Sequence, residues 1–600
     1  MYKAPLKDML FTVEHVANLA AVSQLPGYAE AGLDTARAIL EESARFNEEV
    51  LAPLNRAGDE QPATLKDGVV TTTPGFKEAF EQFGAGGWQG IQHPEVYGGA
   101  ALPKLIATPC IEMINSANVA FALCPLLSDG AIEALLTAGS DALKEAYVPN
   151  LVSGKWTGTM NLTEPQAGSD LSLVRSKAEP QPDGSYRVSG QKIFITFGEH
   201  DMAENLVHLV LARTPGAPEG VKGISLFVVP KFLVNADGSL GKRNDVWCPS
   251  IEHKLGIHGS PTAVLLFGDD KGEVGKGAIG YLVGEENRGL QYMFIMMNAA
   301  RFAVGMQGVA VAERAYQQAA AYARDRVQSR DVGGSAAAVT IIHHPDVRRM
   351  LMTMRAMTEG ARSLAYYAAA ASDHAHHEPD AEQRKSQQAM YEFLVPIVKG
   401  WSTEMSIEAA SLGVQVHGGM GFIEETGAAQ YYRDARILTI YEGTTAIQAN
   451  DLVGRKTARD GGATAQRMIA LMEDTQAQLA GSDNEHLQAI GKQLAPAAVA
   501  LKAVVAMIVE AAQQDPHAAY AGSVPYLKMC GIVFSAWQLG RAALAAHGAL
   551  AQADADQAFL QAKITTARFF AEHILPQGVA MQGSITQGAA ATMALDVEQF

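Results

Sequence analysis

The feature that most limits the fold is the position of the strand-like segments, which are gathered in the middle of the chain. The stretches GSYRVSGQKIFITFG, NLVHLVLARTP and GISLFVVPK are rich in β-branched and aromatic residues and are separated by Gly, Pro and Asp turns. Long segments of helical period precede and follow them. Because a βαβ nucleotide-binding fold needs strands that alternate with helices, this order argues against that fold. We predict a mainly α protein with a compact central antiparallel β domain.

The helical parts divide where the composition changes. Their periodicity indicates a bundle of three or four long helices after the strands, and then a second, Ala-rich helical domain behind the linker RDGGATAQ. The expected boundaries are an N-terminal helical extension over 1–40, an N-terminal α domain over 41–155, the middle β domain over 156–280, the bundle over 281–455 and the additional helical domain over 463–600.

Charge and cysteine content narrow the function classes. The formal net charge of −17 argues against a general binder of nucleic acid or anionic membranes. The four cysteines are scattered and form neither a CxxC pair nor a disulfide framework, which favours a reducing cytoplasm. The start, MYKAPLKDMLFTVEHV, resembles neither a signal peptide nor a transit peptide. No uncharged apolar run reaches about 18 residues, so we expect no membrane span.

The stretch TIYEGTTAIQ, Thr439–Gln448, contains a single carboxylate, Glu442. We interpret Leu438, Ile440 and Tyr441 as a β-type apolar run before it and expect a Gly-Thr-Thr turn after it. Packing does not explain a lone Glu at such a place. These residues alone leave the role of this carboxylate open.

Two segments of the middle domain could contact a cofactor. MNLTEPQAGSDLS offers many donors around Thr163, Gly168 and Ser169, which suits a cofactor edge or a phosphate as well as a plain polar turn. In GQKIFITFGE, Phe194 and Thr196 are two residues apart and therefore share a strand face. They could pack in the core, or they could hold a flat ring with an aromatic face and a hydroxyl.

Two segments of the bundle region are similarly open to two interpretations. DRVQSR ends a long helix, and its Arg326 and Gln328 could hold a pyrophosphate or form a solvated surface. VQVHGGMGFIEE is a helix end that breaks at Gly418-Gly419, and it also permits close approach of backbone to a cofactor.

Two other motifs are weaker evidence for a functional site. GKGAIG, Gly275–Gly280, matches GxGxxG but lacks the preceding strand and following helix, so we interpret it as a loop leaving the β domain. His343 and His344 have no ligand partner at helical spacing, and we expect no metal site.

Together, in order, LTEPQAGSD, GQKIFITFG, RDRVQSR, GVQVHGGMGF and RDARILTIYEGTTAIQ resemble the signatures of the flavin-dependent acyl-CoA dehydrogenases, over about residues 80–455. The start and the helical tail resemble a long bacterial subgroup that includes 3-methylmercaptopropionyl-CoA dehydrogenases and relatives acting on fatty acyl-CoAs. The resemblance implies an N-terminal α domain, a middle β domain and a C-terminal four-helix bundle, with FAD between the β domain and the bundle.

The resemblance also implies roles for particular residues. The implied FAD contacts, some of them from a neighbouring subunit, are Met160, Leu162, Thr163, Gly168, Ser169, Phe194, Thr196, Arg326, Gln328, Gln415, Gly419 and Thr444. The implied substrate contacts are Ser169, Asn298, Arg301 and Gly443. Phe194 stands where many relatives carry Trp, and Ala446 where some carry Gln. Some members place the base where this chain has Ala300, and Glu424 and Glu425 read as surface groups, so Glu442 is the candidate base.

The implied reaction is α,β-dehydrogenation of an acyl-CoA thioester to a trans-2-enoyl-CoA. Glu442 would take the α-proton while the β-hydride goes to flavin N5, in fatty acid β-oxidation. A free Glu has a pKa of about 4.3 and is a weak base, but removal of water by the substrate would raise that pKa toward neutrality. The apolar run before Glu442 would then form a dry wall beside the base. The implied electron acceptor is an electron-transferring flavoprotein, and the implied assembly is a homo-oligomer, a dimer rather than a tetramer. Two alternatives stay open: an oxidase of the same fold, and a weakly active DNA-binding member. The latter would need a basic tail, whereas residues 456–600 hold slightly more acids than bases.

Overall fold

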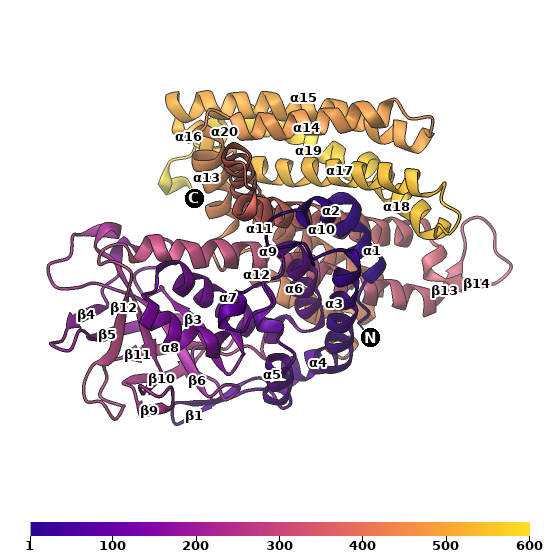
Figure 1. The fold of residues 1–600 in the computed structure, drawn as a ribbon. Coiled ribbons are helices and arrows are strands. Elements are labelled where there is room, and N and C mark those ends of the chain that lie inside the picture. Colours follow the sequence, from indigo (N-terminus) through magenta and orange to yellow (C-terminus); the bar gives the residue numbers. More distant parts are fainter. Residues whose placement is uncertain (1) are drawn as a thin grey trace. The chain divides into compact units, whose positions relative to one another are not determined.

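A computed structural model describes residues 2–600 of the chain. The chain forms two compact units, each built from segments that are distant in sequence. The helical unit comprises Met1–Phe46, Pro103–Ser116 and Arg301–Phe600, and the mixed unit comprises Asn47–Leu102 and Ala117–Ala300. Figure 1 labels their elements.

The mixed unit contains the predicted β domain, which confirms strands gathered in the middle of a mainly helical chain. Its main sheet has eight strands in the order β10-β11-β5-β12-β7-β6-β3, and β4 pairs with β5. The strands are β3 (Trp156–Asn161), β4 (Lys177–Pro180), β5 (Tyr186–Thr196), β6 (Asn205–Ala212), β7 (Ser225–Pro230), β10 (Val246–Ile251), β11 (Thr262–Phe267) and β12 (Ala278–Val283). The smaller elements are β1 (Thr64–Lys66), β2 (Val69–Thr71), β8 (Phe232–Val234), β9 (Leu240–Arg243), α4 (Ala52–Glu60), α5 (Phe76–Ala85), α7 (Val119–Ala138) and α8 (Asp141–Val152).

The prediction of a purely antiparallel domain was wrong at one edge of this sheet. β3 pairs with β6 in parallel, in the register Thr159 to His208. The chain returns to β3's neighbour only after it has formed β4 and β5, and such a crossover connection permits parallel pairing. A buried hydrogen bond of 2.7 Å between Thr159 Oγ1 and His208 Nδ1 joins the register pair. α7 packs on β3 so closely that a Cβ on Gly158 would lie 2.4 Å from the Ala131 side chain.

The prediction that GKGAIG is a loop leaving the β domain was also wrong in part. Gly275 and Gly277 do lie in a turn with positive φ, but Ala278 begins β12, which pairs with both β5 and β7. The segment therefore leads into an interior strand of the sheet rather than out of the domain. Its final glycine, Gly280, packs between Val188 and Val229 of the neighbouring strands.

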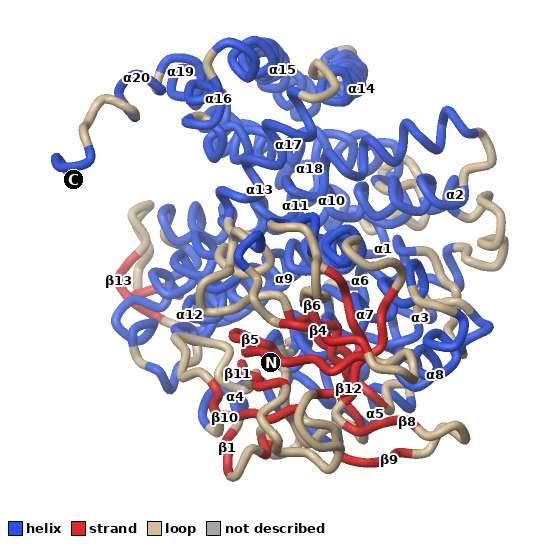
Figure 2. Tube along the Cα trace, turned by 90° about the vertical axis from the view of Figure 1, so that its left-hand side faces the viewer, coloured by secondary structure: helices blue, strands red, loops and turns tan. Residues whose placement is uncertain are grey.

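The helical unit contains the predicted bundle and the additional C-terminal helices. Its long helices are α10 (Pro345–His377), α11 (Ala381–His417) and the part of α9 (Gly289–Asp325) that begins at Arg301. The other elements are α1 (Leu6–Phe11), α2 (Leu19–Val22), α3 (Leu33–Phe46), α6 (Lys104–Ala117), α12 (Ala428–Leu438), α13 (Thr445–Asp451), α14 (Ala463–Ala480), α15 (Glu485–Gln514), α16 (Pro516–Ala521), α17 (Ser523–Ala549), α18 (Gln557–Phe569), α19 (Leu575–Gln587), α20 (Ala589–Thr592), β13 (Val327–Arg330) and β14 (Ala338–Thr340). Figure 2 shows the segment from α14 to α20 as helices and connecting loops, and a short π-helix, Phe570–Ile574, joins α18 directly to α19.

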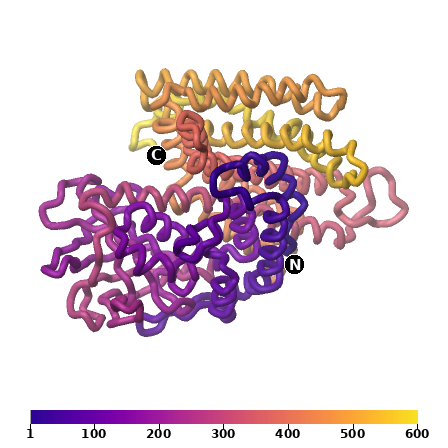
Figure 3. Tube along the Cα trace, viewed as in Figure 1, coloured from indigo at the N-terminus to yellow at the C-terminus, as the bar shows by residue number. Residues whose placement is uncertain are grey.

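A buried network of charges joins distant parts of the helical unit. Arg362 of α10 pairs with Asp8 of α1, with Glu112 of α6 and with Glu313 of α9. Lys563 of α18 pairs with the same Asp8 and with Glu359 of α10. The network therefore holds a helix near the start of the sequence to a helix near its end inside one unit. Figure 3 follows the chain from the indigo first helices to the yellow C-terminal helices.

Among residues 2–600, four helices are long and apolar enough to cross a membrane by length and composition: α7, α9, α15 and α17. This differs from the sequence expectation, which required a fully uncharged run. Within α7, α9 and α17, 78%, 67% and 83% of the apolar window is buried inside the protein, against 44% in α15. The apolar residues of α7, α9 and α17 therefore serve mainly to build protein cores.

Candidate active site

Glu442 lies in a turn between two helices of the helical unit. α12 ends at Leu438 and α13 begins at Thr445. The predicted β-type run before Glu442 was wrong, because Tyr431, Ala435 and Leu438 are buried at helical spacing and form the inner face of α12. Ile440 is 46% exposed, so it does not contribute to a dry wall in this chain.

The turn is built from two consecutive residues with left-handed backbone. Glu442 has φ of 54° and Gly443 has φ of 86°. Glycine adopts this region freely, whereas a residue with a side chain pays a strain cost that is typical of functional sites. Thr444 follows and accepts a hydrogen bond from Ile447 N at 3.3 Å, which caps α13. The expected Gly-Thr-Thr turn is present, and Thr444 has a structural role in it.

The surroundings of Glu442 combine burial with positive charge. Burial raises the pKa of Glu442, while Arg301 and Lys399 oppose that rise. Arg301 lies on α9, is 5% exposed and has Asp451 Oδ2 at 3.6 Å from its Nη1. Lys399 lies on α11 and is fully buried, and burial lowers its pKa to about 7. A carboxylate with a raised pKa beside cations is suited to accept a proton near neutral pH.

The predicted substrate residues on α9 follow from helical spacing. Asn298 is exposed and lies one turn before Arg301, so the two residues lie along the same side of the helix. Ala300 is buried and has no group that could act as a base. Gly443, the remaining predicted substrate contact in this part of the chain, follows Glu442 directly and is half-buried.

The first group of predicted cofactor residues is assembled within the mixed unit. Met160 is the penultimate residue of the buried strand β3, and Leu162, Thr163, Gly168 and Ser169 follow in the next loop. Ile193 N of β5 donates to Thr163 O at 3.0 Å, which places this loop beside the strand that carries Phe194 and Thr196.

A buried ion pair that we did not predict from the sequence holds the same loop. Lys192 Nζ lies 2.8 Å from Glu164 Oε1 and donates to Leu162 O at 3.0 Å. Glu164 also accepts from Ser176 Oγ at 2.6 Å. No signal in the sequence identified this pair, because simple alternation places Lys192 on the same face as Phe194, whereas the structure buries Lys192 and exposes Phe194. The pair makes the loop a fixed edge rather than a mobile turn.

Phe194 owes its position to an irregularity of the strand. Lys192 pairs with Leu265 and Ile195 with Ala263, so Ile193 and Phe194 together oppose a single residue of β11. This β-bulge places Phe194 at φ of 61° with 60% of its surface exposed. A large aromatic side chain presented outward on a strained, well-fixed backbone fits one face of a flat cofactor ring. The alternative of Phe194 in the core is wrong.

The second group of predicted cofactor residues lies in the helical unit, at the shared end of two helices. Arg326 and Gln328 follow α9, and Gln415 and Gly419 lie at the end of α11 and just after it. Tyr322 of α9 stacks on His417 of α11 with ring centroids 4.4 Å apart, which brings the two segments together. All four residues are exposed, and Arg326 Nη2 lies 3.3 Å from Gln328 Oε1. They are available to a phosphate-bearing ligand.

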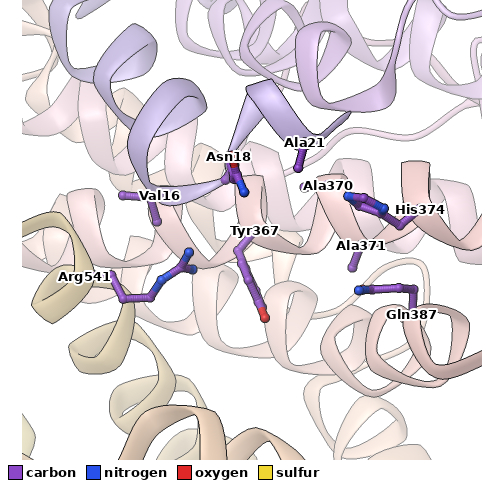
Figure 4. A pocket seen from close by; sticks show the side chains of 10 residues that line it. Val16, Asn18, Ala21, Tyr367, Ala370, Ala371, His374, Gln387 and Arg541 are labelled. Atoms are coloured by element: carbon purple, nitrogen blue, oxygen red, sulfur yellow. The ribbon is translucent and has the colours of Figure 1, made fainter. Parts of the chain in front are cut away.

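A separate cavity of about 140 Å³ lies elsewhere in the helical unit (Figure 4). It is lined by Val16, Ala17, Asn18, Ala21, Tyr367, Ala370, Ala371, His374, Gln387 and Arg541. Arg541 packs 5.1 Å from the Tyr367 ring centroid and donates to Gln538 Oε1 at 2.7 Å. None of the residues predicted for the active site lines this cavity.

Sequence reasoning missed two residues beside Glu442. Lys399 donates from Nζ to the Gly443 carbonyl oxygen at 2.7 Å, and Gln448 Nε2 lies 3.2 Å from the Glu442 carbonyl oxygen. A lone Lys inside the apolar run LVPIVKGW was the available signal for Lys399. Gln448 stands on a short polar helix and carried no comparable signal.

Comparisons with known proteins identify the family of the chain. The family profiles for the N-terminal, middle and C-terminal domains of acyl-CoA dehydrogenase match residues 34–155, 159–269 and 287–456. A profile described as acetyl-CoA dehydrogenase C-terminal like matches residues 468–596.

Two curated proteins are similar over almost the whole chain. The chain is 56% identical to 3-methylmercaptopropionyl-CoA dehydrogenase of Ruegeria pomeroyi, over 98% of each chain. It is 36% identical to the broad-specificity linear acyl-CoA dehydrogenase FadE5 of Mycobacterium tuberculosis, over 96% of each.

Among solved structures, Caenorhabditis elegans ACDH-11 in complex with C11-CoA matches 96% of this chain and 92% of its own, with a TM-score of 0.76 at 20% identity. Bacillus anthracis acyl-CoA dehydrogenase complexed with FAD matches 96% of this chain and 91% of its own, with a TM-score of 0.72 at 21% identity. At such identities these likenesses concern the fold, whereas the curated relatives and the four profiles establish descent. The chain therefore belongs to the acyl-CoA dehydrogenase family.

Proposed function

We propose that Glu442 is the catalytic base of this chain and removes the α-proton of an acyl-CoA thioester. As a member of its family the chain is an oxidoreductase that acts on acyl-CoA, and FAD is the cofactor that membership implies. The observation that carries the proposal is the turn itself: a strained, partly buried carboxylate with a raised pKa between Arg301 and Lys399. The alternative base position holds Ala300, which cannot accept a proton.

The protein groups act by holding and moving one proton. Glu442 must be ionised to accept the α-proton, and exclusion of water by the substrate would strengthen it as a base. A backbone N–H close to Glu442 is suited to donate to the thioester carbonyl and to stabilise the developing enolate. The hydride that leaves Cβ would need an acceptor, and that is the chemistry that bound FAD would supply.

The fixed loop after β3 and the outward ring of Phe194 support binding of the flavin ring by the mixed unit. Thr163, Ser169 and Thr196 supply hydroxyl groups in the same region. The exposed group around Arg326 and Gln415 suits the pyrophosphate and adenosine. Gln415 is sixteen residues after Lys399 on α11, so at 1.5 Å per residue the two are about 24 Å apart along the helix. That span supports a role for this group at the distal end of a cofactor, including one bound by a neighbouring copy.

The substrate we propose is 3-methylmercaptopropionyl-CoA, which is what the relative with 56% identity is named for. Straight-chain fatty acyl-CoAs are the second candidate, because the relative with 36% identity is named for linear substrates. Anaerobic bleaching of the bound flavin across a panel of acyl-CoAs decides between them. A kcat/KM for butyryl-CoA above that for 3-methylmercaptopropionyl-CoA would reverse the order.

Glu442→Gln tests the base directly. The variant should retain FAD, because Gln is nearly isosteric, yet the substrate should no longer bleach the flavin. Glu425→Gln is the matched control, since Glu425 is an exposed carboxylate in a polar loop. Near-normal bleaching in Glu442→Gln would show that the base lies elsewhere.

We further propose an electron-transferring flavoprotein as acceptor and a homo-oligomer, a dimer first, as the working assembly. A solved structure whose title names such a flavoprotein matches 70% of this chain at 26% identity and a TM-score of 0.55. Stoichiometric release of peroxide during turnover in air would favour the oxidase alternative instead. Light scattering at micromolar concentration measures the assembly, and a monomer would contradict the proposal.

A further inference from the structure

Two buried side chains hold the backbone of the turn that carries Glu442. Lys399 Nζ donates to the Gly443 carbonyl oxygen at 2.7 Å. Gln448 Nε2 lies 3.2 Å from the Glu442 carbonyl oxygen and 3.3 Å from that of Gly443. Both Lys399 and Gln448 have no exposed surface. Each carbonyl group of the left-handed pair therefore has a side-chain donor.

These contacts matter because the turn is strained. A non-glycine residue at φ of 54° persists only where its surroundings determine it from several sides. Without the two donors, the turn is free to relax, and the Glu442 carboxylate would move with it. A displacement of about 1 Å in a reacting group can cost about a hundredfold in rate.

The two donors differ in charge, which separates their effects. Lys399 faces Glu442 of the turn, Arg301 of α9 and Glu404 of its own helix. Around them, Asp451 of α13 pairs with Arg301 and Arg455, Thr445 donates to Glu404, and Tyr441 donates to Gln307. Burial lowers the pKa of Lys399 to about 7, so the cation is present at lower pH, where Glu442 takes up its proton. Gln448 is neutral at every pH.

The sign of the charge effect follows from these neighbours. Burial raises the pKa of Glu442, and the cations of Arg301 and Lys399 lower it. Removal of the Lys399 charge leaves Arg301 as the cation that still lowers the pKa of Glu442. The pKa of Glu442 then increases, and the ionised base is lost at a higher pH than in the unaltered protein.

We propose that Lys399 and Gln448 are positioning residues that hold the Glu442–Gly443 turn by its carbonyl oxygens, and that the charge on Lys399 also sets the lower pH limit of activity. The inference rests on the proposed role of Glu442 as base. It assigns Lys399 and Gln448 no contact with substrate or cofactor. It separates a geometric role shared by both residues from an electrostatic role of one.

The test compares Lys399→Met with Gln448→Leu across pH 5 to 9, by kcat and kcat/KM on the best acyl-CoA. Loss of a hydrogen bond from a charged donor should lower kcat about tenfold or more in Lys399→Met, and loss of a neutral one should lower it a few-fold in Gln448→Leu. KM should change less than kcat in both. The acid limb of the pH–activity profile, where activity falls as Glu442 takes up its proton, should move to higher pH in Lys399→Met. It should stay in place in Gln448→Leu.

Controls make the result independent of folding. Lys385→Met removes an exposed lysine from the same helix and should change neither kcat nor the acid limb. Gln448→Leu should fold, because Gln448 Oε1 is buried without a partner and an apolar replacement removes that cost. Thermal unfolding and the content of bound flavin check each variant. If Lys399→Met fails to fold, Lys399→Arg keeps the charge and should keep the acid limb while lowering kcat.

Each outcome decides one part. Wild-type kcat in both Lys399→Met and Gln448→Leu would overturn the positioning role. An acid limb that is the same in Lys399→Met and Gln448→Leu, or one that moves in Lys399→Arg, would overturn the electrostatic role. Activity in Glu442→Gln would instead refute the proposed base, whereas an inactive Glu442→Gln with unaffected Lys399→Met and Gln448→Leu refutes only this inference.

Discussion

Replacement of Lys563 by Met should weaken the attachment of the C-terminal helices to the rest of the helical unit. Lys563 Nζ lies 2.5 Å from Asp8 Oδ1 and 2.8 Å from Glu359 Oε2, and its side chain is 1% exposed. Loss of one partner from a buried ion pair typically costs about 3–5 kcal/mol. Each acid keeps a second cation, Asp8 at Arg362 and Glu359 at Arg355, so the cost should fall near the lower limit.

A loss of about 3 kcal/mol in a cooperative unit of this size corresponds to a decrease in Tm of roughly 4 °C, at about 2.1 cal/mol/K of unfolding entropy per residue. Differential scanning calorimetry measures it. Lys7→Met is the matched control, because Lys7 pairs with Asp556 at 2.6 Å and also joins the first helix to the last domain, but with 76% and 45% of the side chains exposed. Its effect on Tm should be much smaller, because exposed ion pairs contribute little to stability. Equal Tm values for Lys563→Met and Lys7→Met would refute the reasoning.

Three further expectations concern the mixed unit. Burial alone would lower the pKa of His93, but Asp129 and Glu133 raise it to about 9. The stabilisation from the charged His93 is therefore fully present below about pH 6.5 and is lost as the pH rises through about 9. The Tm of the unaltered protein should decline over this alkaline range, and the Tm of His93→Gln should lack that decline. Glu164→Gln should weaken the attachment of the loop after β3 to Lys192. The expected results are faster proteolysis of that loop and weaker retention of FAD. Unchanged FAD retention would contradict this prediction. Phe194→Ala should weaken FAD binding at least tenfold, as measured by fluorescence titration. The Tm of the FAD-free protein should change by less than about 1 °C, because the Phe194 ring is mostly exposed. A large decrease in Tm would show instead that the ring stabilises the fold.

Several features could be predicted because they are local. β-branched and aromatic runs with turn residues between them identified the β domain, and helical periodicity identified the bundle and the C-terminal helices. The end of α11 at His417 followed from Gly418, which adopts φ of 60°. The prediction for Leu438 to Tyr441 was wrong because three or four apolar residues are compatible with a strand and with the end of a helix. Packing of Tyr431, Ala435 and Leu438 decided in favour of the helix.

The sequence by itself determined the family, since the order of the motifs is written in the linear chain, and it singled out Glu442 and the glycine after it as the candidate site. Only the tertiary structure decided what surrounds them. The parallel edge of the sheet, the bulge that presents Phe194 and the pairing of Asp8 with Lys563 all join residues that are far apart in sequence. Lys399 and Gln448 reach the Glu442–Gly443 turn for the same reason. Their contacts depend on how helices pack, and helical packing is set by the whole unit rather than by the residues of any one segment.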